Sequence, residues 1–284
     1  MVSDHQLLGE RTPSRGRAVG DPVPVKVQIV RACQRAGRGG SPTAVVDDGP
    51  LSDVERCAVP RAAGTSHAVF ISAAGNSLRF FTAEGELPAC GHGTVAALAV
   101  LAERTGVVRY ETMLRAGGRT FVGEVSGGVA VFDPGPVELR VPGSAECEGI
   151  LAALGVGKAE CRIASVGRPR LLVRVADRRA LAELVPDLTS LRAACDRVGL
   201  LGCYVYSPPS DDGRAAARMF APSIGVPEDI ANANSTACLA AHLGTVTVDM
   251  GDSLGQPSTI IASARPGPTG PVVRVGGAAT VSGC

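Results

Sequence analysis

The chain has 284 residues, of which 45% are hydrophobic, and its formal net charge is +1. This length and apolar content suffice for a large buried core or for two domains. The near-neutral charge argues against a nucleic-acid-binding protein, and no apolar run approaches the roughly 20 residues of a membrane span. The first two dozen residues lack the apolar segment of a secretory signal, so we expect a cytoplasmic protein.

The first half of the chain reads as short strands followed by one helix that is apolar on almost every side. It is preceded by residues 1–24, which have no periodicity and are predicted to be a disordered leader. The predicted elements are strands at 26–30, 43–48, 67–72 and 77–82, the helix at 91–104, and a hairpin at 119–135.

The second half repeats this order, with a polar loop that opens a second apolar helix. The predicted elements are strands at 161–167, 170–177, 200–207 and 214–222, a helix at 179–195 interrupted at Pro186, a buried helix within 227–243, and a closing hairpin from TIIASA and VVRVGGAATV.

A helix that is apolar all round must be enclosed. We therefore predict an α+β fold of two similar domains, residues 25–135 and 136–284, whose terminal strands can cross over. Each domain is a curled, mainly antiparallel sheet around a central helix. If both helix N-termini face one cleft, their free N–H groups suit a carboxylate.

The first helix begins within EGELPACGHGTVAALAVL at 84–101. Gly91 and Gly93 would let a ligand approach the backbone, and Thr94 is a further pocket candidate. Cys90 and His92 add groups that can move protons, and a helix N-terminus lowers the pKa of a thiol. The alternatives are a packing role for Cys90 and a helix-start hydrogen bond for His92.

The second helix begins within PEDIANANSTACLAAHL at 227–243. Asp229 is predicted to be either a pocket acid or a charge partner of the helix start. Asn232, Asn234 and Ser235 are predicted to bind the substrate or to cap the helix. Gln256 is a weaker pocket candidate.

Several runs along the chain resemble the PhzF family, the isomerases of phenazine biosynthesis and their relatives with the diaminopimelate-epimerase fold. The runs are GGSPTAVV, RFFTAEGELPACGHGT, RMFAPSIGVPED, LAAHLG and GQPS followed by VRVGG. The resemblance covers residues 26–283. It implies two similar domains and a cleft that binds a small carboxylic acid and moves a proton within it. Such proteins are often dimers, so a homodimer is one of the oligomeric states that the resemblance leaves open.

The resemblance also assigns roles to individual residues. The family's AGHPT-like block falls on 90–94, and its PEDPATGSA-like block falls on 227–235. The glutamate that acts as acid and base in the phenazine enzyme falls on His67, within SHAVFI. Histidine suits proton transfer because its ordinary pKa is about 6.5. The alternative is a histidine at the start of a strand with no catalytic role.

The CGHG sequence at 90–93 also resembles the motif of epimerases and proline racemases, in which the cysteine is one of two opposed bases. The second cysteine of those enzymes would fall near 231–233. Cys238 lies about a turn further into the helix, so we expect it to pack in the core. Cys90, His92 and His67 lack a further ligand set, so no metal site is expected.

The sequence therefore predicts a cofactor-independent isomerase that shifts a proton and a double bond in a small carboxylic acid of secondary metabolism. The branch that fits best makes the 4-alkyl-L-proline units of lincomycin, hormaomycin and pyrrolobenzodiazepine antibiotics, with a 4-alkylidene pyrroline carboxylate as substrate. The alternatives are a cysteine-based epimerase or racemase of an amino or imino acid, and a non-catalytic carboxylate-binding relative.

Overall fold

The computed structural model describes residues 26–72, 76–268 and 270–282, so the leader expected over 1–24 lies outside the described residues. The elements confirm the α+β class. Those of the first half are β1 (Val27–Gln34), β2 (Ser41–Asp47), α1 (Asp53–Ala62), β3 (His67–Ile71), β4 (Leu78–Thr82), β5 (Gly85–Leu87), α2 (Gly91–Thr105), β6 (Arg109–Ala116), β7 (Arg119–Ser126) and β8 (Val129–Phe132).

The second half adds nine strands, four α-helices and two single turns of 3-10 helix to the described chain. Its elements are β9 (Glu138–Arg140), α3 (Ser144–Leu154), β10 (Cys161–Val166), β11 (Arg168–Arg174), α4 (Arg178–Ala182), α5 (Leu188–Arg197), β12 (Cys203–Tyr206), β13 (Arg214–Ala221), η1 (Pro222–Ile224), β14 (Val226–Asp229), α6 (Ala233–Leu243), β15 (Val246–Met250), η2 (Asp252–Leu254), β16 (Ser258–Arg265) and β17 (Val272–Val281).

The two halves repeat one order of strand pairing. In the first, β1 pairs antiparallel with β2, β2 parallel with β3, and β3 antiparallel with β4. Strands β10 to β13 follow the same order. A parallel pair needs a crossover connection, which α1 supplies in the first half and α4 with α5 in the second. In each half a loop then leads into the central helix, α2 or α6.

The central helices are buried along almost their whole length. Leu98 of α2 and Leu239 of α6 are fully buried, and both belong to one hydrophobic core with strands from both halves. Full burial of a leucine side chain contributes roughly 1.5–3 kcal/mol. The sheets therefore close around both helices and bury most of each one.

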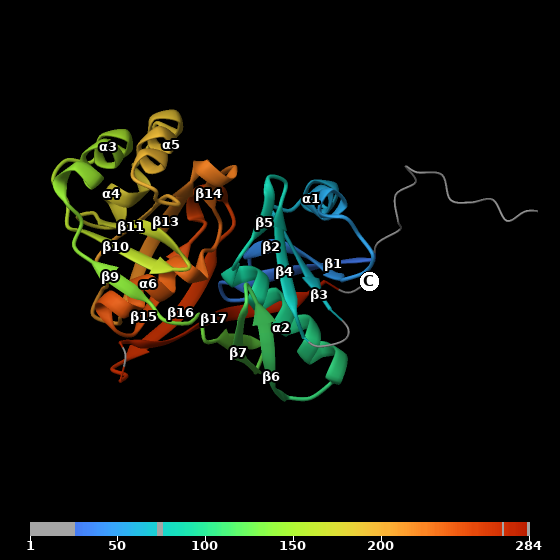
Figure 1. Ribbon diagram of the computed structural model, residues 1–284. Coiled ribbons are helices and arrows are strands. Elements are labelled where there is room, and N and C mark those ends of the chain that lie inside the picture. The colour runs from blue at the N-terminus through green and yellow to red at the C-terminus, as the bar shows by residue number, and fades with distance from the viewer. Residues whose placement is uncertain (1–25, 73–75, 269, 283–284) are drawn as a thin grey trace, which may run out of the picture.

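The last strand joins the halves. β17 pairs antiparallel with β16 of the second half and also with β1 and β8 of the first. A Cβ on Gly276 would overlap the carbonyl oxygen of Ala130 on β8, so only glycine allows this close passage. Figure 1 shows the halves side by side, with the red β17 running between them.

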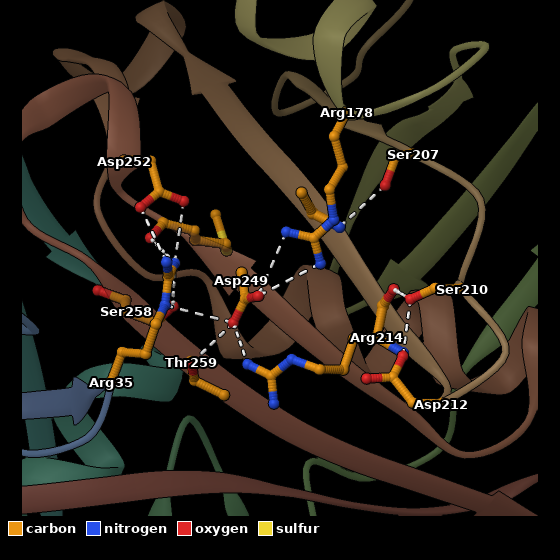
Figure 2. A network of polar contacts seen from close by, with 12 residues as sticks. Arg35, Arg178, Ser207, Ser210, Asp212, Arg214, Asp249, Asp252, Ser258 and Thr259 are labelled. Carbon is orange, nitrogen blue, oxygen red and sulfur yellow. Dashed lines mark hydrogen bonds and ion pairs between the residues drawn. The ribbon is translucent and has the colours of Figure 1, made fainter.

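A buried carboxylate makes a second link between the halves. Asp249 of β15 accepts ion pairs from Arg35, which follows β1, at 3.3 Å, and from Arg178 at 3.3 Å and Arg214 at 2.6 Å. Thr259 donates a further hydrogen bond to it at 2.9 Å. In Figure 2 the three guanidinium groups converge on this one side chain. Charges so buried are tolerated because they are paired.

Some elements differ from the sequence prediction. The hydrophobic pattern predicted no helix at α1 or α3 and no strand at β6. α1 carries Pro60 and faces solvent along much of its length, so its apolar signal is weak. The helix expected at 179–195 is two short helices, α4 and α5, on either side of Pro186. Within the described part of the chain, no helix is both long and apolar enough to cross a membrane.

Candidate active site

A cavity of about 50 Å³ lies where the two central helices begin. That volume is room for a few water molecules. Seven of the residues expected in the site line it: His67, Cys90, Gly91, His92, Asp229, Asn232 and Asn234. The remaining wall comes from β11, the loop before α2, the ends of β5 and β10, and residues near β12, β13 and β14.

The N-terminal ends of α2 and α6 lie against each other. A Cβ on Gly91, the first residue of α2, would be 2.6 Å from the Cβ of Ala233, the first residue of α6. The same atom would be 3.0 Å from the backbone nitrogen of Asn234. Glycine at 91 therefore allows the two helices to start in contact, and it brings their first residues into one site.

Cys90 occupies the N-cap position of α2, but its side chain makes no capping hydrogen bond. Ser, Thr, Asp and Asn are the usual caps because their oxygens accept from backbone N–H groups. Thr94 instead fixes the turn by donating its hydroxyl to the Cys90 carbonyl at 2.8 Å. The thiol of Cys90 thus remains available to the cavity.

His92 bridges the two halves. Its Nδ1 lies 2.9 Å from the carbonyl oxygen of Ala231, in the loop before α6. A carbonyl only accepts, so Nδ1 carries a hydrogen and donates it. The other ring nitrogen, Nε2, lies 3.5 Å from the Cys90 sulfur. Thiol and imidazole can therefore share one proton across this contact.

His67 stands at the first position of β3 and is only 4% exposed. Its Nδ1 lies 2.8 Å from the Ser66 hydroxyl oxygen, so Nε2 is the nitrogen that can exchange a proton with a ligand. The ring meets that of His92 edge to face, with centroids 4.4 Å apart. The histidine is thus a buried member of the cavity wall and not a surface residue.

The two histidines have pKa values displaced in opposite directions. Burial, and then the charge on His92, hold the pKa of His67 well below 6.5. Burial also opposes charge on His92, but the charge of Cys90, the hydrogen bond to it and the charge of Asp229 outweigh this effect and raise its pKa to about 9. At neutral pH one ring is a base and its neighbour carries a proton, a combination typical of acid–base sites.

Asp229 acts on the start of α6. One of its carboxylate oxygens accepts from the Asn232 side-chain amide at 2.9 Å, and the other from the Ala231 backbone N–H at 3.4 Å. The oxygen of the Asn232 amide accepts from the Ser235 N–H at 2.9 Å and caps the helix. Asp229 therefore orients the cap, while its charge supports the proton on His92.

The remaining predicted residues lie in different surroundings. Gly93 packs between Phe80 and the Cys90 sulfur, where a Cβ would lie 3.0 Å and 3.1 Å from them. Ser235 is fully buried in the first turn of α6. Gln256 was expected in the pocket, but its side chain lies away from the cavity and accepts from exposed Arg31 at 3.4 Å.

The sequence reasoning missed Arg170, a buried arginine of β11 that lines the cavity and donates to the Ser235 hydroxyl at 3.1 Å. An arginine at the start of the apolar run RLLVRV reads as the solvent-exposed beginning of a strand. The available clue was the apolar run at 171–173 that follows it, and this run gives no indication of the partners of Arg170.

A second chamber, of about 100 Å³, adjoins the first and shares Cys90 and Asn234 with it. Three aromatic rings line it, those of Phe80, Phe121 and Phe132. Arg119 and Asp133 also line this second chamber, so its wall is both aromatic and charged. Cys90 lies between it and the chamber that contains the two histidines.

Among the described residues, His67, Cys90 and His92 form the group that could hold a metal ion, with ligand atoms within 4.8 Å of one another. Imidazole and thiolate are the ligands that Zn²⁺ prefers, at about 2.0–2.3 Å. At those bond lengths the three side chains would have to draw closer together around the ion. The expectation that no metal takes part stays a prediction.

The comparisons with known proteins agree with this fold. A family model described as PhzC-PhzF, phenazine biosynthesis-like protein, matches residues 33–283. A solved phenazine biosynthesis protein of the PhzF family from Bacillus anthracis superposes with a TM-score of 0.77 at 15% identity, covering 90% of this chain and 96% of that one. The chain belongs to the PhzC-PhzF family.

Its curated relatives are named isomerases. An uncharacterized isomerase of Clostridium acetobutylicum is 26% identical over 223 residues, 72% of this chain and 74% of that protein. The trans-2,3-dihydro-3-hydroxyanthranilate isomerase of Pseudomonas fluorescens is 28% identical over 248 residues, 80% of this chain and 85% of that protein. The protein is an enzyme of the isomerase and epimerase class.

Proposed function

We propose that the enzyme moves a proton, and with it a double bond, within a small carboxylic acid, and that it does so without a cofactor. The observation that carries this proposal is the pair of neighbouring rings in one cavity, His67 and His92, which favour opposite protonation states. Such a pair can take a proton at one carbon and return one at another.

The steps balance with the groups present. Neutral His67 removes a proton from a carbon beside a conjugated double bond, and the electron pair of the broken C–H bond enters the conjugated system. The double bond shifts, and the proton shared by Cys90 and His92 forms the new C–H bond at the far carbon. Exchange with water then returns His67 to its neutral form and the Cys90–His92 pair to its protonated form.

The proposed substrate is a 4-alkylidene pyrroline carboxylate of antibiotic biosynthesis. The rings of Phe80, Phe121 and Phe132 in the second chamber could pack against an apolar substituent on the acid, which supports this choice of substrate. The replacement of the family's glutamate by His67 supports a substrate other than the dihydro-hydroxyanthranilate type. A polar hydroxylated ring would gain little from that aromatic wall.

A two-thiol racemase is the competing reaction, because Cys90 lines the cavity. That reaction needs a second thiol on the opposite face of the substrate. Cys238 is fully buried within the hydrophobic core, and burial raises its pKa. This position counts against the competing reaction.

The experiment is a screen of β,γ-unsaturated and alkylidene cyclic carboxylates, followed by ultraviolet absorbance because a shifted double bond changes conjugation. We expect turnover of a 4-alkylidene pyrroline carboxylate, and a loss of roughly 10²–10⁴-fold in His67→Gln. Racemisation of proline or hydroxyproline without any double-bond shift would replace this proposal with the racemase.

A further inference from the structure

Arg170 is a buried charged side chain whose hydrogen-bond partners are all uncharged. It is 2% exposed, and its Nη1 donates to the Ser235 hydroxyl at 3.1 Å. Its Nη2 donates to the carbonyl oxygens of Arg168 at 2.7 Å and Val166 at 3.4 Å. Within the described chain, its Nε has no hydrogen-bond partner, and no carboxylate lies within ion-pair distance.

Buried Arg56 and partly buried Arg218, in contrast, have carboxylate partners. Arg56, 7% exposed, pairs with Asp48 at 2.8 Å and Asp53 at 3.1 Å. Arg218 pairs with Glu228 at 2.8 Å. A guanidinium stays protonated even when buried, so it cannot escape the cost by losing its charge. Arg170 is therefore a fixed cation whose counter-ion the described chain does not supply.

The position of Arg170 indicates where a counter-ion would come from. The side chain lines the same cavity as His67, Cys90 and His92, and it contacts α6 through Ser235. The backbone N–H of Ser235, expected to bind a carboxylate, is already occupied by the Asn232 cap at 2.9 Å. The contact between Gly91 and Ala233 further restricts the space between the two helix ends.

We propose that Arg170 is the anchor for the substrate's carboxylate, which its Nε–H and remaining N–H donors receive from within the cavity. This inference rests on the proposed function and deepens it. The substrate must be an anion, and its ester or amide would leave the guanidinium unpaired. Binding at Arg170 also places the reacting carbons between the anchor and the His67, Cys90 and His92 cluster.

The test uses the full chain and two flat probes of the same shape, pyrrole-2-carboxylate and the neutral pyrrole-2-carboxamide, in calorimetric titrations. We expect the wild type to prefer the carboxylate by roughly 10- to 100-fold. Arg170→Gln should abolish this preference, and Arg170→Lys, which keeps the charge, should restore part of it. The control is Arg174→Gln, an exposed arginine on the same strand, which should leave the preference unchanged.

If Arg170 has only a structural role, Arg170→Gln should lower the melting temperature and leave the preference for the carboxylate intact. That result would overturn the proposal. If Arg170→Gln does not fold, a crystal structure of the wild type with pyrrole-2-carboxylate decides, since the carboxylate must lie on the Arg170 guanidinium. A carboxylate seated instead on the N–H groups of 91–94, or no binding at all, refutes the anchor. The absorbance screen separates the two ideas, because turnover without an Arg170 contact leaves the isomerase standing.

Discussion

The rings of His67 and His92 meet edge to face, with their centroids 4.4 Å apart. Each ring affects the other, because a proton on His92 disfavours a second positive charge on His67. Cys90 and Asp229 favour that proton on His92. The cavity therefore contains a neutral base and a protonated neighbour at the same pH, which a proton shift requires.

The first prediction concerns pH. Activity should decline as the pH rises through about 9, where His92 loses its proton. Activity should persist below pH 6.5, because the pKa of His67 lies well under that value. Turnover rates measured from pH 5 to 10, together with NMR titration of both imidazoles, check the acid and alkaline limbs of this pH profile. An acid limb centred near pH 6.5 would contradict the assignment.

Stability should follow the same two groups. The raised pKa of His92 contributes stability that is complete below pH 6.5 and is lost as the pH rises to about 9. The lowered pKa of His67 contributes stability that is present above pH 6.5 and is lost as the pH falls below it. Urea unfolding across this range checks both slopes. His92→Gln should remove the alkaline slope and weaken the acid one, because it also removes a charge that lowers the pKa of His67.

The second prediction concerns Cys90. Cys90→Ser removes the charge and the sulfur contact that favour protonated His92, whereas burial still opposes it. The pKa of His92 should therefore fall, and the alkaline limb of activity should move to lower pH. NMR titration of His92 in this variant measures the effect. An unchanged pKa would mean that the 3.5 Å contact does not govern the proton.

The third prediction separates the two roles of Asp229. Asp229→Asn removes a charge but keeps an oxygen that can accept from Asn232, so α6 should stay capped. The pKa of His92 should fall by less than in Cys90→Ser, because Cys90 has the larger effect. The control, Asn232→Ala, should cost about 0.5–2 kcal/mol of unfolding free energy with little change in the His92 pKa. The reverse pattern would contradict these roles.

The fourth prediction concerns the contact between the central helices. Gly91→Ala places a Cβ 2.6 Å from that of Ala233, so the helix ends must separate. We expect a loss of about 1–3 kcal/mol of unfolding free energy and a large loss of activity. Gly157→Ala, at an open position, is the control. Equal stability and activity in the two variants would show that the helix contact is dispensable.

The fifth prediction concerns metal. Activity should withstand exhaustive chelation, because the proposed steps use only protein groups. Added Zn²⁺ should inhibit, since it would occupy the lone pairs of His67 and Cys90 on which proton transfer depends. Activity that disappears with a chelator and returns with Zn²⁺ would assign this cluster to a catalytic metal instead.

Local sequence signals were sufficient to predict an element whose structure is determined by a single segment of the chain. The glycines and apolar run at 90–104 predicted the buried helix α2 and its proton-transferring start. Helix α1 was missed because Pro60 and its polar face hide its periodicity, although the parallel pairing of β2 with β3 requires a connection there. That requirement is visible only once the strands are paired.

Long-range partners limited the prediction of the site. Asp229 could be placed near the start of α6, but its hydrogen bond to Asn232 depends on backbone geometry. Arg170 and Ser235 are far apart in sequence and meet only when β11 packs beside α6. Gln256 was a weaker pocket candidate, and in the fold its side chain accepts a hydrogen bond from Arg31 instead.

The most direct test of the central claim is turnover in deuterium oxide. With a 4-alkylidene pyrroline carboxylate, we predict that one deuterium enters the new C–H position as the double bond migrates, without scrambling at a stereocentre. His67→Gln should abolish this labelling, and Cys238→Ala, a change in the core, should leave it near the wild-type rate. Labelling at a stereocentre without double-bond migration, lost in Cys90→Ser and in Cys238→Ser but kept in His67→Gln, would contradict the account.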